Sequence, residues 1–348
     1  MSYFISPIGP GDRRALEQVD RLLEHEGIQR DKNLDYICGM YDDDYQLVAT
    51  GSCFGSTLRC FAVDHGHQGE GLLNEIITHL MAVQADRGNV RLFLYTKPDA
   101  AKFFGDLGFY EIARVPDKLV FMENRKDGFQ SYLSSLAKTA RPDGVSAAVV
   151  MNANPFTLGH QYLAETAAAA CDTLHLFVVS EDLSLVPASV RKMLVQKGVA
   201  HLPNVALHDC GPYMISSATF PSYFLKDQKT VVEAQARLDL AIFLRIAAAL
   251  HITARFVGEE PFSEATGIYN RVMEATLPAS GVACRVIPRK TGDGQTPISA
   301  SAARLALKQN DLNAFRRMVP ESTFAWFSSP EALPVLRRIQ QAENVWHH

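Results

Sequence analysis

The stretch that decides the fold runs from Val145 to Val179 and reads VSAAVVMNANPFTLGHQYLAETAAAACDTLHLFVV. Its apolar runs predict one buried strand over Val145–Met151 and another over Thr173–Val179, with a helix that begins near His160 between them. Strand, helix and strand at this spacing form a right-handed βαβ unit of a parallel sheet, so we predict an α/β fold. Ligands of such sheets bind beyond the carboxyl ends of the strands, which places the site at the turn before the helix.

The residue types of that turn favour an anion. A helix N-terminus offers unpaired amide donors and a partial positive charge, and Gly159 lets a ligand approach the backbone closely. Thr157 and His160 lie on one side of the helix start, so a hydroxyl and an imidazole point at the same anion. The alternative is structural: Thr157 caps the helix and His160 is incidental.

A second helix start with similar chemistry lies near the end of the chain, in Thr296-Pro-Ile-Ser-Ala-Ser-Ala-Ala-Arg304. Ser299 and Ser301 open an alanine-rich helix, and the guanidinium of Arg304 follows one turn inside it. Two helix starts suited to phosphate in one domain indicate a triphosphate that is held at both ends.

These two motifs resemble those of the nucleotidyltransferase superfamily, as Thr157-Leu-Gly-His160 and Ile298-Ser-Ala-Ser-Ala-Ala-Arg304. The longer segments Asn154-Pro-Phe-Thr-Leu-Gly-His160, Ile215-Ser-Ser-Ala-Thr-Phe-Pro-Ser-Tyr-Phe-Leu-Lys226 and Phe256-Val-Gly-Glu-Glu-Pro261 are similar to those of the citrate lyase ligases, over nearly the whole chain. That resemblance implies that ATP, with Mg²⁺, reacts with acetate to give acetyl-adenylate and pyrophosphate. The thiol of the prosthetic group on the acyl carrier protein of citrate lyase then displaces AMP. His160, Thr157 and Arg304 would be the catalytic residues, and Asn154 and Phe156 would belong to the nucleotide site.

Further binding residues are expected where strands end. Arg191 and Lys192 lie in the first turn of a helix, where Arg191 either binds a phosphate or carboxylate or belongs to an exposed basic face. The loop that ends at Lys226 is a plausible wall for a small acid and a nucleotide. Gly258 and Glu259 follow a fourth strand, where the carboxylate either binds the nucleotide or caps the next helix. Arg289 follows a fifth strand and is a candidate phosphate ligand.

The first 125 residues form a separate unit. The sequence predicts a helix over Asp12–Glu26, three antiparallel strands, a glycine-rich turn with a long helix, and further strands around a short helix. This unit resembles the GNAT acetyltransferase fold in two segments, Gln68-Gly69-Glu70-Gly71-Leu72-Leu73 and Phe103-Phe104-Gly-Asp-Leu-Gly-Phe109. In that fold, the backbone amides of the first segment bind the pyrophosphate of coenzyme A. Leu73 replaces the usual glycine or alanine, and Phe104 replaces a tyrosine that many members use as an acid.

A phenyl ring cannot donate a proton, so the sequence argues against acetyl transfer by this unit. Binding of a CoA-like arm by Gln68, Gly69 and Gly71 remains open, as does a purely structural role of these glycines in a tight turn. We expect a polar connecting helix over residues 126–144, a nucleotidyltransferase domain over residues 145–327 and a terminal helix over residues 328–348.

Composition excludes several classes of function. The 348 residues are 47% apolar and 21% charged, with a formal net charge of −4, which supplies no basic field for nucleic acid or anionic lipid. The six cysteines are scattered without C-x-x-C spacing, which favours reduced thiols over disulfides or zinc. No signal peptide or membrane span is expected, and no dedicated metal site, so we expect a cytoplasmic protein.

The sequence leaves two alternatives to the ligase function. One is an adenylyltransferase that joins AMP to a phosphorylated acceptor of the phosphopantetheine or mononucleotide type. The other is a non-catalytic protein that binds acyl carrier proteins. Release of free AMP separates the ligase from the adenylyltransferase.

Overall fold

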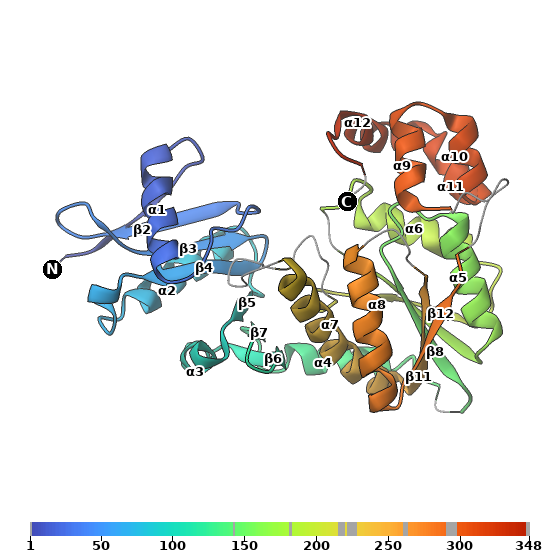
Figure 1. Ribbon diagram of the computed structural model, residues 1–348, viewed down its shortest axis with the longest axis horizontal. Helices are drawn as coiled ribbons and strands as arrows, with labels where there is room; N and C mark the ends of the chain where they lie inside the picture. The colour runs from blue at the N-terminus through green and yellow to red at the C-terminus, as the bar shows by residue number, and fades with distance from the viewer. Residues whose placement is uncertain are drawn as a thin grey trace. The chain divides into compact units, whose positions relative to one another are not determined.

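The computed structural model describes residues 2–141, 143–180, 183–214, 220, 228–259, 264–289 and 298–345. The chain divides into two compact units (Figure 1). The first comprises Met1–Ser131 with Phe220–Ala234, and the second comprises Tyr132–Thr219 with Gln235–His348.

The first unit is built on a mixed seven-stranded sheet. In sheet order its strands are β1 (Phe4–Pro7), β2 (Tyr36–Tyr41), β3 (Leu47–Phe54), β4 (Thr57–Val63), β5 (Phe93–Thr96), β7 (Leu119–Glu123) and β6 (Tyr110–Val115). Only β4 and β5 pair in parallel, and this pairing is confined to Thr57 with Phe93 and Leu58 with Leu94. The order of elements expected from the GNAT resemblance is present, with β1 as a strand that the sequence did not reveal.

Two helices cover opposite faces of this sheet. Helix α1 (Arg13–His25) packs into a core with Cys60 and Ala62, and α2 (Leu72–Asp86) packs into a separate core with Cys38 and Met40. A short helix, α3 (Ala101–Asp106), precedes β6, and α4 (Gly128–Ala137) lies in the segment expected to connect the domains. Apolar side chains at helical spacing on α1 and α2 explain why both helices form against the sheet.

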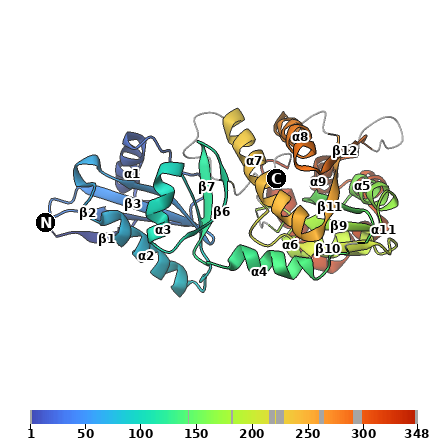
Figure 2. The same ribbon diagram turned by 90° about the horizontal axis from the view of Figure 1, so that it is seen from below.

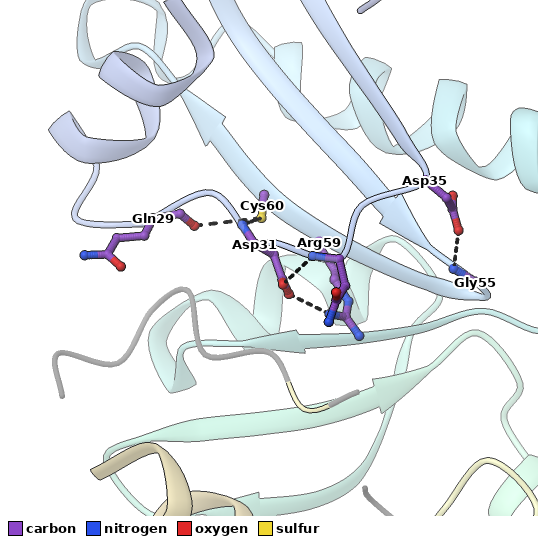
Figure 3. A network of polar contacts seen from close by, with 7 residues as sticks. Gln29, Asp31, Asp35, Gly55, Arg59 and Cys60 are labelled. Atoms are coloured by element: carbon purple, nitrogen blue, oxygen red, sulfur yellow. Dashed lines mark hydrogen bonds and ion pairs between the residues drawn. The ribbon is translucent and has the colours of Figure 1, made fainter. Parts of the chain in front are cut away.

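A buried polar network fixes the segment that follows α1 (Figure 3). Arg59 on β4 is 1% exposed and donates from Nη1 to the Oδ2 atom of Asp31 over 2.6 Å. The backbone amide of Asp31 donates to the Cys60 thiol, whose Sγ lies 3.9 Å from the Gln29 carbonyl oxygen. Because a buried ion pair needs close geometry to offset desolvation, this pairing holds the segment against the sheet.

The second unit contains a five-stranded sheet that is entirely parallel. In sheet order its strands are β10 (Val205–Asp209), β9 (Thr173–Val178), β8 (Ser146–Met151), β11 (Ile252–Gly258) and β12 (Ala283–Ile287). The chain moves outward from β8 first through β9 and β10 and then through β11 and β12. The strand order therefore reverses at β8, and ligands of such sheets bind beside this reversal. The predicted α/β class and parallel sheet are confirmed.

Helices cover both faces of this sheet (Figures 1 and 2). One layer shares a single core with β8 and β9 and contains α5 (Leu158–Ala169), α6 (Ala188–Gly198), α9 (Ala300–Lys308), α10 (Leu312–Met318), α11 (Glu321–Phe327) and α12 (Leu333–Gln341). Helices α7 (Gln228–Leu250) and α8 (Glu264–Thr276) lie on the other side of the sheet. The sequence predicted one terminal helix, which is α12, but did not reveal α10 and α11. Among the described residues, no helix combines the length and the apolar character needed to cross a bilayer.

Candidate active site

The turn between β8 and α5 is closed by a reciprocal cap. Thr157 is the N-cap of α5, in an extended conformation, and its Oγ1 accepts the backbone N–H of His160 over 3.4 Å. In return, the backbone N–H of Thr157 donates to Nδ1 of His160 over 3.1 Å. Thr157 therefore caps the helix, as the structural alternative predicted. The same cap fixes the orientation of the His160 imidazole.

This cap also sets the protonation state of the imidazole. Since Nδ1 accepts a hydrogen bond, the proton of the neutral ring sits on Nε2. Burial, together with the nearby charges of Arg289 and Arg304, lowers the pKa of His160 to about 4. At neutral pH the ring is therefore an uncharged donor through Nε2–H.

A cavity of about 310 Å³ opens where α5 and α9 begin. The expected site residues that line it are Thr157, Gly159, His160, Gly258, Glu259, Arg289, Ser299 and Ser301. A Cβ atom on Gly159 would lie 3.4 Å from the carbonyl oxygen of Ile298, the residue before Ser299. The two helix starts that the sequence singled out are thus close together in space, although about 140 residues separate them in the chain.

The α9 side of the cavity is capped as well. The Oγ of Ser299 accepts the backbone N–H of Ala302 over 3.1 Å. On the strand side, Nε of Arg289 donates to the carbonyl oxygen of Glu259 over 2.9 Å, which links the ends of β11 and β12. Of the described residues lining the cavity, Glu259 alone carries a carboxylate, and its side chain is exposed.

Arg304 lies in the interior behind this cavity and does not line it. The guanidinium is 2% exposed and donates to three groups: the carbonyl oxygen of Val345 over 2.7 Å, that of Asn154 over 2.5 Å and Oγ of Ser301 over 3.2 Å. Burial lowers its pKa to about 10. Through these bonds Arg304 joins α9 to the loop before α5 and to the segment after α12.

Arg191 is also buried, with 0% exposure, and also donates to main-chain carbonyls. Its Nη1 lies 2.8 Å from the carbonyl oxygen of Asn152 and 2.7 Å from that of Val179, so it ties the ends of β8 and β9 together. Asn154 accepts the N–H of Val186 over 3.0 Å through Oδ1. These contacts hold the loops beside the cavity without placing Arg191 or Asn154 on its surface.

Phe156 is fully buried beside α6. A Cβ atom on Gly198 would overlap with its ring, so the glycine leaves room for the aromatic side chain. The same ring stacks on the imidazole of His160, with centroids 5.9 Å apart and planes 17° apart. Lys226, the remaining expected residue of this unit, lies outside the described residues.

Three polar residues line the cavity that the sequence did not single out as ligands: Asn152, Tyr162 and Thr266. Asn152 directly follows β8, so its position at a strand end was a usable signal. Tyr162 and Thr266 reach the cavity from helices α5 and α8, and only the packing of these helices brings them there. Among the described residues, no group of three or more histidine, cysteine, aspartate or glutamate side chains is arranged to hold a metal ion.

The first unit has its own cavity, of about 650 Å³, beside the start of α2. Gln68, Gly69 and Gly71 line it, together with apolar residues that include Phe61, Val63, Leu72, Leu73, Phe103 and Phe104. Gly69 and Gly71 have φ angles of +90° and +83°, which favour glycine, and a Cβ atom on either would meet nothing within 4 Å. Phe104 is 3% exposed and packs in tilted contact against Phe61.

Comparison with known proteins gives one consistent result over most of the chain. A family model for the citrate lyase ligase C-terminal domain matches residues 146–327. The protein named [citrate [pro-3S]-lyase] ligase from Klebsiella pneumoniae is 40% identical over 323 residues, covering 90% of this chain and 93% of that protein. The protein of the same name from Escherichia coli strain K12 is 36% identical over 323 residues, covering 91% of this chain and 92% of that protein.

Solved structures of acetyltransferases are also similar to part of the chain. A GNAT-family acetyltransferase from Staphylococcus aureus has a TM-score of 0.31 and 14% identity, covering 36% of this chain and 100% of that chain. The ribosomal-protein-S18-alanine N-acetyltransferase from Escherichia coli has a TM-score of 0.28 and 18% identity, covering 35% of this chain and 92% of that chain.

The matched relatives are named as ligases, so this chain is an enzyme of the ligase class. It belongs to the citrate lyase ligase family.

Proposed function

We propose that the protein uses ATP to acetylate the thiol prosthetic group of the citrate lyase acyl carrier protein, and releases AMP and pyrophosphate. The names of its relatives support citrate lyase as the target, and the lining of the cavity supports the use of ATP. The observation that carries the proposal is the meeting of two capped helix starts at one cavity, which His160 also lines with Nε2–H as a donor of its neutral ring. Helix amides and neutral donors suit a polyphosphate.

In the first step, an oxygen of acetate attacks the α-phosphorus of ATP. The acetate O–P bond forms, the bond to the pyrophosphate oxygen breaks, and acetyl-adenylate remains. His160 would donate through Nε2–H to the phosphate oxygens, while Ser299, Ser301 and the amides of α9 would hold the far end of the triphosphate. Such positioned donors stabilise charge as it develops in the transition state and undergo no reorganisation.

In the second step, the carrier thiol attacks the carbonyl carbon of acetyl-adenylate. The C–S bond forms, the C–O bond to AMP breaks and the thiol loses its proton. No side chain of the protein needs to become covalently attached in this scheme. The first unit would bind the CoA-like arm of the prosthetic group, since its cavity joins a glycine loop suited to phosphates with an apolar wall suited to the pantetheine stem.

Magnesium would enter with the triphosphate. The described residues of the cavity offer it one carboxylate, Glu259, together with hydroxyls, which fits a magnesium ion that keeps several waters and binds mainly through phosphates. The ion would neutralise phosphate charge. We place the reaction in the cytoplasm.

The test is isotope exchange between pyrophosphate and ATP. The proposal predicts exchange by the full-length protein that depends on acetate and needs no carrier. Exchange that is independent of acetate, or transfer of AMP onto a phosphorylated acceptor, would instead identify an adenylyltransferase.

A further inference from the structure

A buried group of charged and aromatic side chains lies on the side of the parallel sheet covered by α7 and α8. It consists of Arg255 on β11, Asp239 and Phe243 on α7, and Tyr269 on α8. Arg255 and Asp239 are 4% and 5% exposed. The hydroxyl of Tyr269 donates to Oδ2 of Asp239, and the guanidinium lies over the ring of Phe243, 4.3 Å from its centroid.

Arg255 is poorly compensated for a buried charge. Its Nη2 lies 3.9 Å from Oδ2 of Asp239 and 3.4 Å from the hydroxyl oxygen of Tyr269. Among the described residues, neither Nε nor Nη1 of Arg255 has a hydrogen-bond acceptor. A guanidinium has five N–H donors, and buried donors are satisfied in most native structures, so an acceptor is missing at this position.

Other buried arginines of the molecule show what a structural role looks like. Arg59 meets the carboxylate of Asp31 over 2.6 Å in the first unit. Arg191 and Arg304 each donate to several carbonyl oxygens at 2.5 to 3.0 Å. Compared with them, Arg255 has a distant carboxylate and an aromatic neighbour, and its buried Nε and Nη1 donors have no acceptor among the described residues.

The position of Arg255 connects it with the active site. It lies on β11 three residues before Gly258, and Gly258 lines the nucleotide cavity. Tyr269 lies one helical turn after Thr266 on α8, and Thr266 lines the same cavity. Arg255 and Tyr269 thus lie below the carboxyl edge of the sheet, three residues along the chain from residues that line the cavity, although neither lines it. That edge is where the second substrate would meet the α-phosphate.

We propose that Arg255 binds the carboxylate of the small acid that the enzyme activates. The assignment rests on the proposed function, because it presumes a carboxylic acid as the second substrate. A planar guanidinium with unused donors matches a carboxylate in shape and charge. The apolar rings of Phe243 and Tyr269 beside it suit an acid with a short alkyl group.

Kinetics of acetate-dependent pyrophosphate exchange give the first test. Replacing Arg255 by Lys or by Met should raise the KM for acetate about tenfold or more, with the KM for ATP within about twofold of wild type, since a single bidentate contact is worth roughly that factor. The matched control is Arg285→Met on the neighbouring strand β12, where the side chain is exposed. It should leave both constants unchanged.

The outcomes separate the two claims. A wild-type enzyme that exchanges without acetate would refute the proposed function. A wild-type enzyme that needs acetate, combined with an unchanged KM for acetate in the Arg255 variants, would overturn the role of Arg255 alone. Equal increases in both KM values would also overturn it, because they would indicate a general disturbance of the site.

A second measurement needs no variant and keeps the claim testable if the variants fail to fold. In full-length wild-type protein labelled with ¹⁵N-arginine and assigned by through-bond spectra, sodium acetate should shift the Nε–H signal of Arg255 and slow its exchange with solvent. Sodium chloride at equal ionic strength should do neither. An unmoved Arg255 signal, or the same shift with chloride, would overturn the assignment.

Discussion

The cavities of the two units differ in what lines them. In the second unit, imidazole and hydroxyl groups line a cavity at two helix starts, with the guanidinium of Arg289 at a strand end. In the first unit, phenyl and aliphatic side chains form much of the wall beside one glycine loop, together with polar residues such as His67 and Lys97. Polar donors select phosphate, and apolar walls select the stem of an extended arm. Under the proposed function, adenylate formation would take place in the second unit and carrier binding in the first, so each assignment can be tested separately.

The largest effect is expected at His160. Replacing it by Ala removes the Nε2–H donor, and we expect adenylate formation to fall by about a hundredfold or more, the usual scale for one such group. Acetate-dependent pyrophosphate exchange measures the loss. The matched control is His201→Ala, an exposed histidine of the same unit. A soluble His160→Ala protein with near-normal exchange would refute the site.

The next effect concerns Arg304. Lysine keeps the charge but cannot reach the Val345, Asn154 and Ser301 oxygens together, so Arg304→Lys should lower the free energy of unfolding by about 2 kcal/mol or more. The KM for ATP should rise as the two helix starts lose their link. Chemical denaturation and exchange kinetics measure the two effects, and an unchanged value of both would contradict the role of Arg304 described above.

A smaller and more selective effect is expected at Gly71. A leucine there would fill the open space beside the loop, so carrier acetylation should fall about tenfold while pyrophosphate exchange is retained. Gly88→Leu is the matched control: Gly88 has a φ angle of +81°, similar to the +83° of Gly71, also has nothing within 4 Å of a Cβ atom, and lies away from the cavity. Equal loss of both activities in Gly71→Leu would rule out a docking role.

The smallest effect concerns stability in acid. His175 and His208 share a buried hydrogen bond of 2.8 Å, and burial lowers the pKa of each to about 4. The unfolded chain binds protons near pH 6.5, so this stabilisation is present above that pH and is lost as the pH falls towards 4. Between pH 7 and 5.5 we expect a loss of about 1 kcal/mol per histidine. The double replacement by Gln should flatten this slope, and an unchanged slope would refute the account.

The sequence revealed local structure better than long-range contacts. The βαβ unit was predictable because β8, α5 and β9 follow from apolar periodicity, and the cap at Thr157 follows from residue type. From the sequence, the two helix starts could be related only because both carry residues suited to phosphate. Their actual approach, with Gly159 near Ile298, depends on the parallel sheet.

The roles of the arginines could not be predicted from the sequence. Arg191, Arg289 and Arg304 all suggested anion ligands, yet only Arg289 lines the cavity. Whether a guanidinium reaches a ligand or a main-chain carbonyl depends on the depth at which its helix packs, which no local pattern encodes. The sequence did not indicate a binding role for Arg255. An arginine within an apolar segment only breaks the apolar pattern, and its neighbours in space are known only from the structure.

The most direct test of the central claim is a product analysis of the full-length protein with ATP, acetate and the thiol form of the carrier. The account predicts AMP, pyrophosphate and acetyl-thioester in equal amounts, with acetyl-adenylate formed when the carrier is left out. An AMP-containing dinucleotide, or AMP released without acetate, would contradict it.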